Sequence, residues 1–329
     1  EVEDELEKYV RQSADNELAR PTGDGIGKIE FNSNLAHLYA HFVRHTIDTS
    51  LEGLTIVYDG ANGAASSVGP EILSGLGAKV ININVNPDGL NINHHCGSTH
   101  IEGLQVAVQQ HNADLGIAND GDADRCLLVD EKGQVLDGDQ IMLLCALKLK
   151  EEGKLKGDTI VGTVMSNIGF HKAAEELGMK TVSTAVGDRY VLEYMREHNL
   201  SVGGEQSGHV IFLDHNTTGD GMLTAVQVAA LMKEKKQPLS ELAGIMTKYP
   251  QVLVNVRVAT KTGWEDNDLI KAAIVTAEGE LGDEGRVLVR ASGTEPLIRV
   301  MAEGPNQEEL QSLCQEIADI IGREQGLAE

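Results

Sequence analysis

Short apolar runs alternate with amphipathic stretches along most of the chain. The runs at 54–58, 115–118 and 126–129 are short and continuous, which is typical of buried strands. Segments between such runs repeat their apolar residues every three or four positions, as in 35–47, and this spacing predicts amphipathic helices. The alternation of the two patterns predicts an α/β protein.

The pattern predicts two successive mixed α/β domains followed by a smaller α+β C-terminal domain. Strand and helix patterns alternate over 31–138, and a second such series occupies 139–250. Within the second series we expect a strand at 200–202 that opens into a glycine-rich loop. Residues 251–329 change to a β-α-β-β-α order, which is typical of a sheet with helices on one face. Residues 1–30 read as a charged helix and a glycine-rich connector.

Composition narrows the classes of partner. The 329 residues carry a net charge of −24, which argues against nucleic acid and anionic membrane as partners, since both need basic surface. The four cysteines lack metal-binding spacing, and no apolar run approaches the roughly 20 residues of a membrane span. These features predict a reduced, cytoplasmic protein. Any phosphate site must be formed by a local cluster of basic groups, because the net negative charge of the chain repels phosphate.

The stretch AND-GDADR places Asp120, Asp122 and Asp124 directly before Arg125, between two apolar runs. Crowded carboxylates repel one another, and a divalent cation such as Mg²⁺ relieves that repulsion. A solvated acidic turn is the simpler alternative. An EF-hand calcium loop is rejected, because its sixth position must be glycine and here is Arg125, and because the flanks read as strands. We therefore expect a metal loop between two strands.

The loop after the strand near residue 290 has the composition of a phosphate site. Arg290, Ser292, Gly293 and Thr294 supply a guanidinium, hydroxyl groups and exposed backbone N–H groups, and Arg299 follows closely. A hairpin with surface salt bridges explains the same residues equally well.

The stretch GGEQSGH has the composition of a sugar-binding loop. Glu205, Ser207 and His209 fall on one side of an extended backbone, and the flanking glycines would let a ligand approach.

A further anion contact is expected at the start of a helix, where Gly187, Asp188 and Arg189 follow a strand. Capping of that helix by Asp188 is the structural alternative.

Taken in order, these loops resemble those of the α-D-phosphohexomutase superfamily. GDADR resembles its metal loop, GEQSGH its sugar loop and RASGTEPLIRV its phosphate-binding loop. Within the superfamily the chain is most similar to the bacterial phosphoglucosamine mutases, through GEQSGHVI, VDEKGQVLDGDQIM, TVMSNIG and RASGTEPLIRVMAEG. The Gly187–Arg189 turn also fits that group.

The resemblance implies an isomerase that converts glucosamine 6-phosphate into glucosamine 1-phosphate through a phosphoserine and a bisphosphorylated sugar. It implies Mg²⁺ on Asp120, Asp122 and Asp124 with Arg125 beside it. Glu205 and Ser207 would bind the ring hydroxyls. The loop that begins at Arg290 would bind the phosphate.

The superfamily's serine loop is not found in this sequence. We therefore expect that an N-terminal domain is missing, that residues 1–30 are its tail, and that the chain alone is inactive. The alternatives are a related phosphoglucomutase or phosphomannomutase, and a non-catalytic sugar-phosphate-binding protein. Nothing in the loops demands an amino sugar. Exposed surface between domains leaves a homodimer possible.

Overall fold

The computed structural model describes residues 2–14, 20–30, 32, 34–292 and 295–326. The chain divides into two compact units, Glu1–Leu38 and Tyr39–Glu329. The first unit holds helix α1 (Val2–Ala14) and a short 3₁₀ helix η1 (Gly23–Gly25). Helix α2 (Asn34–Arg44) begins in the first unit and continues into the second. Everything described below belongs to the second unit.

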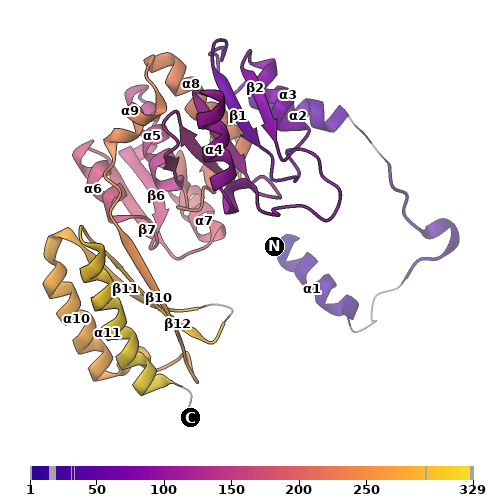
Figure 1. Ribbon diagram of the computed structural model, residues 1–329. Coiled ribbons are helices and arrows are strands. Elements are labelled where there is room, and N and C mark those ends of the chain that lie inside the picture. Colours follow the sequence, from indigo (N-terminus) through magenta and orange to yellow (C-terminus); the bar gives the residue numbers. More distant parts are fainter. Residues whose placement is uncertain (1, 15–19, 31, 33, 293–294, 327–329) are drawn as a thin grey trace. The chain divides into compact units, whose positions relative to one another are not determined.

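The first sheet has the strand order β2-β1-β3-β4-β5. Its strands β1 and β2 are labelled in Figure 1. Strands β2, β1 and β3 are parallel, whereas β4 and β5 are antiparallel to their neighbours. Every residue of β3 is buried, which agrees with its continuous apolar run. The elements of this part are β1 (Thr55–Asp59), α3 (Val68–Gly75), β2 (Lys79–Ile83), η2 (Gly97–Thr99), α4 (Glu102–His111), β3 (Leu115–Asn119), β4 (Cys126–Asp130) and β5 (Val135–Leu136).

The second sheet has the order β7-β6-β8-β9, with β9 antiparallel to β8. The strand predicted at 200–202 begins two residues later and includes two glycines of the expected loop. The elements are α5 (Gly138–Glu151), η3 (Lys156–Asp158), β6 (Thr159–Thr163), α6 (Ile168–Glu176), β7 (Lys180–Thr184), α7 (Asp188–His198), β8 (Val202–Gly204), β9 (Val210–Phe212), α8 (Gly221–Lys235), α9 (Leu239–Leu242) and η4 (Ala243–Ile245).

One hydrophobic core runs through both sheets. It includes Ile56 and Ile117 of the first sheet, Ile160 and Val210 of the second, and most of α8. Helix α8 is apolar on nearly all sides, which is typical of a helix enclosed by other elements. Because the core is shared, the strand ends of both sheets are held in fixed relation to each other.

The third sheet is antiparallel, in the order β10-β12-β11, and has its own core. Helices α10 and α11 lie side by side on one of its faces (Figure 1). The elements are β10 (Gln251–Arg257), η5 (Trp264–Asp266), α10 (Asp268–Leu281), η6 (Gly282–Glu284), β11 (Arg286–Ala291), β12 (Leu297–Glu303) and α11 (Gln307–Gln325). The predicted fold class is thus confirmed. The predicted domain boundaries at 138/139 and 250/251 stay predictions.

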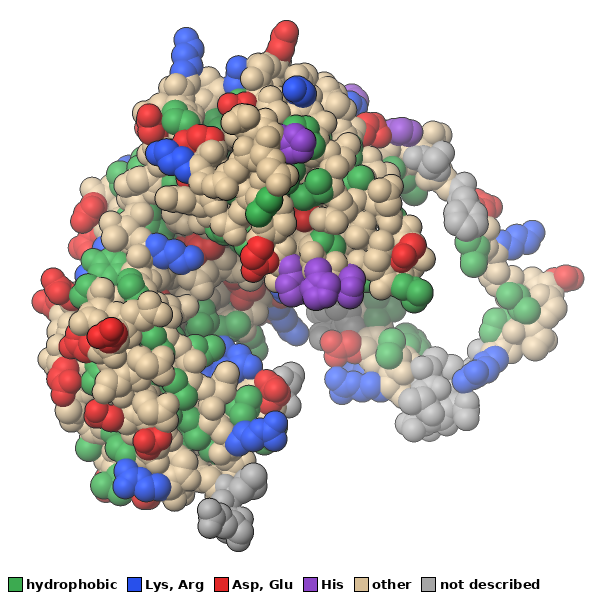
Figure 2. Space-filling view, viewed as in Figure 1, with side chains coloured by type: hydrophobic (Ala, Val, Ile, Leu, Met, Phe, Trp, Pro, Cys, Tyr) green, Lys and Arg blue, Asp and Glu red, His purple; other side chains and the backbone are tan. Residues whose placement is uncertain are grey.

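Acidic and basic side chains are interspersed over the face shown in Figure 2. Among the described residues, no helix is both long and apolar enough to cross a membrane.

Candidate functional site

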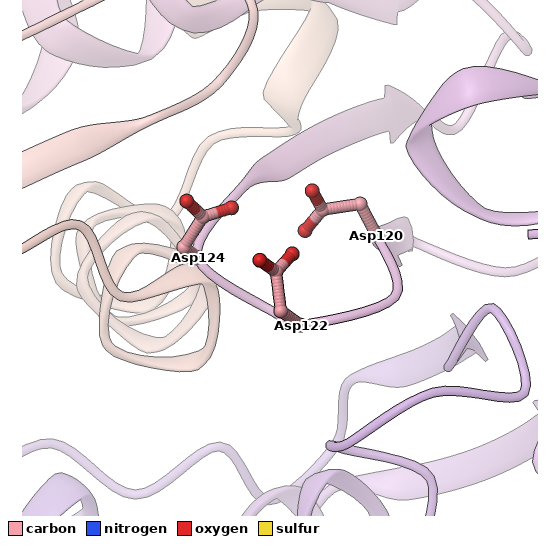
Figure 3. A group of neighbouring side chains, drawn as sticks. All are labelled: Asp120, Asp122 and Asp124. Atoms are coloured by element: carbon pink, nitrogen blue, oxygen red, sulfur yellow. The ribbon is translucent and has the colours of Figure 1, made fainter. Parts of the chain in front are cut away.

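The three aspartates lie in the loop that joins β3 to β4. One carboxylate oxygen from each of Asp120, Asp122 and Asp124 lies within 4.8 Å of the others, and the three side chains turn toward one another (Figure 3). Asp120 is buried, Asp124 half-buried and Asp122 exposed. Burial, together with the charges of the other two carboxylates, raises the pKa of Asp120 to about 6. The loop therefore holds negative charge that a cation would stabilise.

Neighbouring backbone holds this loop in shape. The N–H of Ala64 donates to the carbonyl of Gly121 (2.8 Å), and the N–H of Gly221, at the start of α8, donates to the carbonyl of Ala123 (2.9 Å). Ala123 has a left-handed backbone, with φ of 66°. A Cβ atom on Gly63 would overlap the backbone of Gly121. The loop is thus pre-shaped by its surroundings.

Asn119 supports the loop from the core. Its side-chain amide donates to the carbonyl of Arg125 (2.7 Å), and its Oδ1 accepts from the hydroxyl of Tyr58 (3.0 Å). Both side chains are fully buried. Sequence reasoning missed this pair. A buried Asn directly before the aspartates was the available signal, because buried amides need specific partners.

The three aspartates fit a metal ion better than a solvated turn. Asp124 Oδ1 is buried and has no hydrogen-bond partner among the described residues. Nε of Arg125 lies 3.7 Å from Asp120 Oδ2 and 3.9 Å from Asp124 Oδ1, so it balances only part of the charge. Carboxylate oxygens are ligands for hard cations. The triad is therefore a candidate metal site.

The glycine-rich loop that follows β8 meets the metal loop directly. Arg125 and His209 form an antiparallel β-bridge, and the N–H of Cys126 donates to the carbonyl of Gly208 (3.0 Å). His209 is only 3% exposed, and Nε2 of its ring lies 3.5 Å from Asp124 Oδ2. Neither ring nitrogen has a hydrogen-bond partner within the described chain. His209 is thus buried with its polar edge toward the metal loop.

The turn before α7 joins the same cluster. The N–H of Gly187 donates to Oε1 of Glu205 (2.9 Å), and Oδ2 of Asp188 lies 3.7 Å from Nε2 of His209. Asp188 is the first residue of α7, with Gly187 at the N-cap position, and Oδ1 of Asp188 accepts from the N–H of Arg189 (2.8 Å), so the side chain also satisfies a donor of the first turn. Arg189 pairs with Glu193 along the helix. The structure therefore brings three of the predicted loops together.

The role assigned to two glycines needs correction. The sequence interpretation was that the glycines open the backbone to a ligand. Gly203 and Gly204 instead lie within β8, where a Cβ on Gly203 would come 2.8 Å from the carbonyl oxygen of Val161, and one on Gly204 would overlap the backbone of His209. Strand packing, not ligand access, requires glycine there.

An open pocket of 480 Å³ lies beside the cluster. Its lining includes Arg125, Thr163, Met165, Glu205, Ser207 and Lys248. Ser207 is exposed there. The pocket is large enough for a sugar-sized ligand and is bordered by both charge types, so it can orient a polar molecule.

The predicted phosphate loop lies at one end of the third sheet. Arg290 on β11 is directly opposite Arg299 on β12, and burial, followed by the charge of Arg299, lowers the pKa of Arg290. Arg299 pairs with Glu295 (3.2 Å), but no described acidic side chain pairs with Arg290. Like charges opposite each other in a sheet are destabilising, and an anion would relieve this. Gly293 and Thr294 lie outside the described residues.

Ser292 and Lys261 complete the described part of that loop. Ser292 is 3% exposed, and its Oγ accepts from the N–H of Glu295 (3.3 Å). Nζ of Lys261 donates to the carbonyl of Ser292 (2.8 Å), which brings a third cation to the loop. Sequence reasoning missed Lys261, because it lies 31 residues before Ser292 and only the fold brings it there.

Known protein families match the three parts of the chain that contain the three sheets. The phosphoglucomutase/phosphomannomutase models match residues 35–133 (alpha/beta/alpha domain II), 137–249 (alpha/beta/alpha domain III) and 253–320 (C-terminal domain). A phosphoglucosamine mutase of Symbiobacterium thermophilum is 54% identical over 98% of this chain and 72% of its own length. That of Bacillus subtilis is 49% identical over 99% of this chain and 73% of its own length.

Solved structures share the fold. A phosphoglucomutase/phosphomannomutase family protein of Burkholderia thailandensis superposes with a TM-score of 0.77 at 20% identity, over 97% of this chain and 70% of that one. An Aspergillus fumigatus N-acetylphosphoglucosamine mutase in complex with GlcNAc-6P and magnesium gives 0.70 at 23% identity, over 88% and 69%. The family resemblance drawn from the sequence is thus confirmed. Because the three family models cover most of the chain, and because curated relatives are about half identical to it over nearly its whole length, the chain belongs to the phosphoglucomutase/phosphomannomutase family.

Proposed function

We propose that this chain forms the metal, sugar and phosphate sites of a phosphoglucosamine mutase, which interconverts glucosamine 6-phosphate and glucosamine 1-phosphate. The observation that carries the proposal is the meeting of three loops at His209, whose Nε2 lies 3.5 Å from Asp124 and 3.7 Å from Asp188. Identity of about 50% to named phosphoglucosamine mutases supports this substrate over glucose or mannose phosphates.

Asp120, Asp122 and Asp124 would hold Mg²⁺. Their clustered oxygens and the orphaned Oδ1 of Asp124 support this assignment. When bound, the ion supplies positive charge that neutralises a phosphoryl group. The rigid backbone around Gly121 and Ala123 keeps the carboxylates in place, so little reorganisation accompanies binding.

The sugar would occupy the pocket beside the metal loop. Glu205 and Ser207 border this pocket and would accept hydrogen bonds from, or donate them to, the ring hydroxyls. The bond from Gly187 fixes one oxygen of Glu205 and leaves the other for ligand. Arg125, Asp188 and His209 lie where the loops meet, and we propose these three residues and Arg189 as further contacts to the ligand's polar groups.

The phosphate that does not react would bind at the end of the third sheet. Arg290 and Arg299 supply two adjacent guanidinium groups, and Lys261 adds an ammonium. Ser292, Gly293 and Thr294 are proposed as further contacts, through backbone N–H groups and hydroxyls. Local cation clustering would overcome the repulsion expected from a chain of net charge −24.

Phosphoryl transfer depends on in-line positioning and charge neutralisation more than on covalent chemistry by the protein. The covalent carrier in this mechanism is a phosphoserine. It donates its phosphoryl group to the bound monophosphate, and the resulting bisphosphate reorients and returns the other group. No serine loop of this kind was found in the 329 residues. We propose that this chain supplies binding and orientation in that cycle.

A coupled assay tests the proposal. With glucosamine 6-phosphate, Mg²⁺ and a trace of the bisphosphate, we expect turnover by the whole gene product and none by these 329 residues alone. Preference for glucose or mannose phosphates would favour the related hexose mutases instead. Binding of sugar phosphate without turnover by the whole gene product would favour a non-catalytic binding protein.

A further inference from the structure

A fully buried carboxylate ends the central strand of the third sheet. Glu303 closes β12 and is 0% exposed. It accepts four hydrogen bonds: from Nε of Arg286 (2.6 Å), Nε2 of Gln251 (2.8 Å), the N–H of Ile168 (3.0 Å) and Nδ2 of Asn167 (3.3 Å). Burying a charge is costly unless partners surround it. The four donors therefore compensate the cost of burying the Glu303 carboxylate.

The donors come from two parts of the protein. Arg286 and Gln251 belong to the third sheet itself, whereas Asn167 and Ile168 form the start of α6 in the second α/β part. A second bond crosses the same junction, because Arg286 also donates to the carbonyl of Ser166 (2.5 Å). Glu303 therefore ties the third sheet to the N-terminus of α6.

The connecting segment is fastened at the same place. The side chain of Asn167 accepts from the N–H of Tyr249 and donates to its carbonyl, both at 3.0 Å. A Cβ atom on Gly169 would overlap the carbonyl of Thr247, so the segment lies directly against α6. The chain just before β10 is thus held against α6.

The two ends of the β11–β12 hairpin carry different groups. The strands pair without interruption from Arg286 opposite Glu303 to Ala291 opposite Ile298. At about 3.4 Å per residue, the far end lies roughly 17 Å from the base. The phosphate loop follows Ala291. Because paired strands are stiff, the orientation set at the base is transmitted to that loop.

The α6 end of the junction borders the sugar pocket. Thr163 and Met165, which precede the junction residues Ser166 and Asn167, line that pocket together with Glu205. One short segment therefore carries a wall of the pocket and the attachment of the hairpin.

We propose that Glu303 is a positioning residue, which clamps the base of the hairpin to α6 and so sets the phosphate loop at the reach of a single sugar phosphate held in the pocket. This inference rests on the proposed function. A ligand that must contact two loops at once gains affinity only when their spacing is correct. A ligand that contacts one loop is indifferent to that spacing.

The test compares two ligands in the whole gene product. Glu303→Gln keeps the size of the side chain and an acceptor oxygen but removes the charge that holds Arg286. We expect the dissociation constant for glucosamine 6-phosphate to rise by about 10- to 100-fold. The constants for inorganic phosphate and for Mg²⁺ should change less than about twofold, because each needs one loop only.

Matched variants guard against a trivial loss of folding. Glu309→Gln removes an exposed carboxylate from α11 and should leave every constant unchanged. Asn167→Ser retains an N-cap for α6 but loses the amide contacts to Glu303 and Tyr249, so it should reproduce the effect of Glu303→Gln with that carboxylate intact. It serves in place of Glu303→Gln if the latter does not fold.

Two results would overturn the proposal that Glu303 positions the phosphate loop. One is unchanged affinity for the sugar phosphate in both junction variants. The other is an equal loss for sugar phosphate and inorganic phosphate, which would mean that the phosphate loop itself is damaged. If the unaltered protein binds inorganic phosphate but none of the hexose phosphates, the proposed function fails, and the clamp fails with it.

Discussion

The metal loop and the phosphate loop carry opposite charges and are supported in different ways. Backbone bonds from Ala64 and Gly221, together with the buried amide of Asn119, hold the metal loop from behind. The phosphate loop extends from a hairpin of a three-stranded sheet, and its arginines face each other. The metal loop joins two strands of a core shared by two sheets, whereas the phosphate loop joins two strands of a sheet with a separate core.

The difference indicates which contacts determine the affinity of each loop for its ligand. Carboxylates that are fixed in advance can bind a cation with little rearrangement. Arginines at the end of a hairpin keep their own spacing, but their distance from the sugar pocket depends on the base of the hairpin. Metal affinity should therefore depend on local contacts, and sugar-phosphate affinity on the junction as well.

The largest expected effect comes from breaking the metal loop itself. Asp124→Asn removes one charge from the triad. We expect kcat of the whole gene product at saturating Mg²⁺ to fall by at least about 100-fold, since metal-derived charge stabilisation is worth several kcal/mol. The control Asp283→Asn, an exposed residue on η6, should have no effect. Near-normal kcat in Asp124→Asn would remove the triad from the site.

The second prediction concerns the positive charge of the phosphate loop. Arg290→Ala should weaken binding of glucosamine 6-phosphate by about 1.5–3 kcal/mol in calorimetry, the usual contribution of a charged hydrogen bond. Mg²⁺ affinity should stay unchanged. Arg196→Ala, on the exposed side of α7, controls for simple loss of a positive charge. Equal weakening by both variants would point to long-range charge rather than to a phosphate site.

The support behind the metal loop is tested without touching a carboxylate. Asn119→Ala removes the bond to the carbonyl of Arg125. We expect Mg²⁺ affinity to fall by about tenfold, because residues that orient ligands typically contribute this much. Tyr58→Phe, which removes only the hydroxyl bonded to Asn119, should fall between Asn119→Ala and the unaltered protein. Unchanged affinity in both variants would show that the loop keeps its shape unaided.

A further expected effect concerns pH at the junction. Asp139 is buried beside Asn167, whose N–H it accepts at 2.7 Å, and burial followed by the charge of Asp137 raises its pKa to about 7. A raised acid pKa in the folded state adds stability that is complete below about pH 4 and is lost as the pH rises through about 7.

Asp139→Asn keeps an acceptor for Asn167 and should remove this pH dependence. Between pH 5 and 8 the unaltered chain should lose roughly 2–3 kcal/mol more free energy of unfolding than the variant, as measured by urea denaturation. Parallel stability curves for the two proteins would contradict the shifted pKa.

Local patterns were enough for most elements and for the residue types of each loop. The apolar runs located β1, β3 and β4, and the spacing of Asp120, Asp122 and Asp124 indicated a metal site. The β8 strand was misplaced, because Gly203 and Gly204 look like loop residues until their neighbours in the sheet are seen. Glycine has two uses, and sequence alone does not separate them.

The sequence by itself determined the order of strands and helices, the chemistry of each loop and the family, because these follow from hydrophobic period and from short motifs. Only the tertiary structure decided which loops meet. The contact of His209 with Asp124, the support of Asn119 by Tyr58 and the burial of Glu303 against α6 all join residues far apart in the chain. Such contacts depend on how sheets pack, and no local pattern encodes that packing.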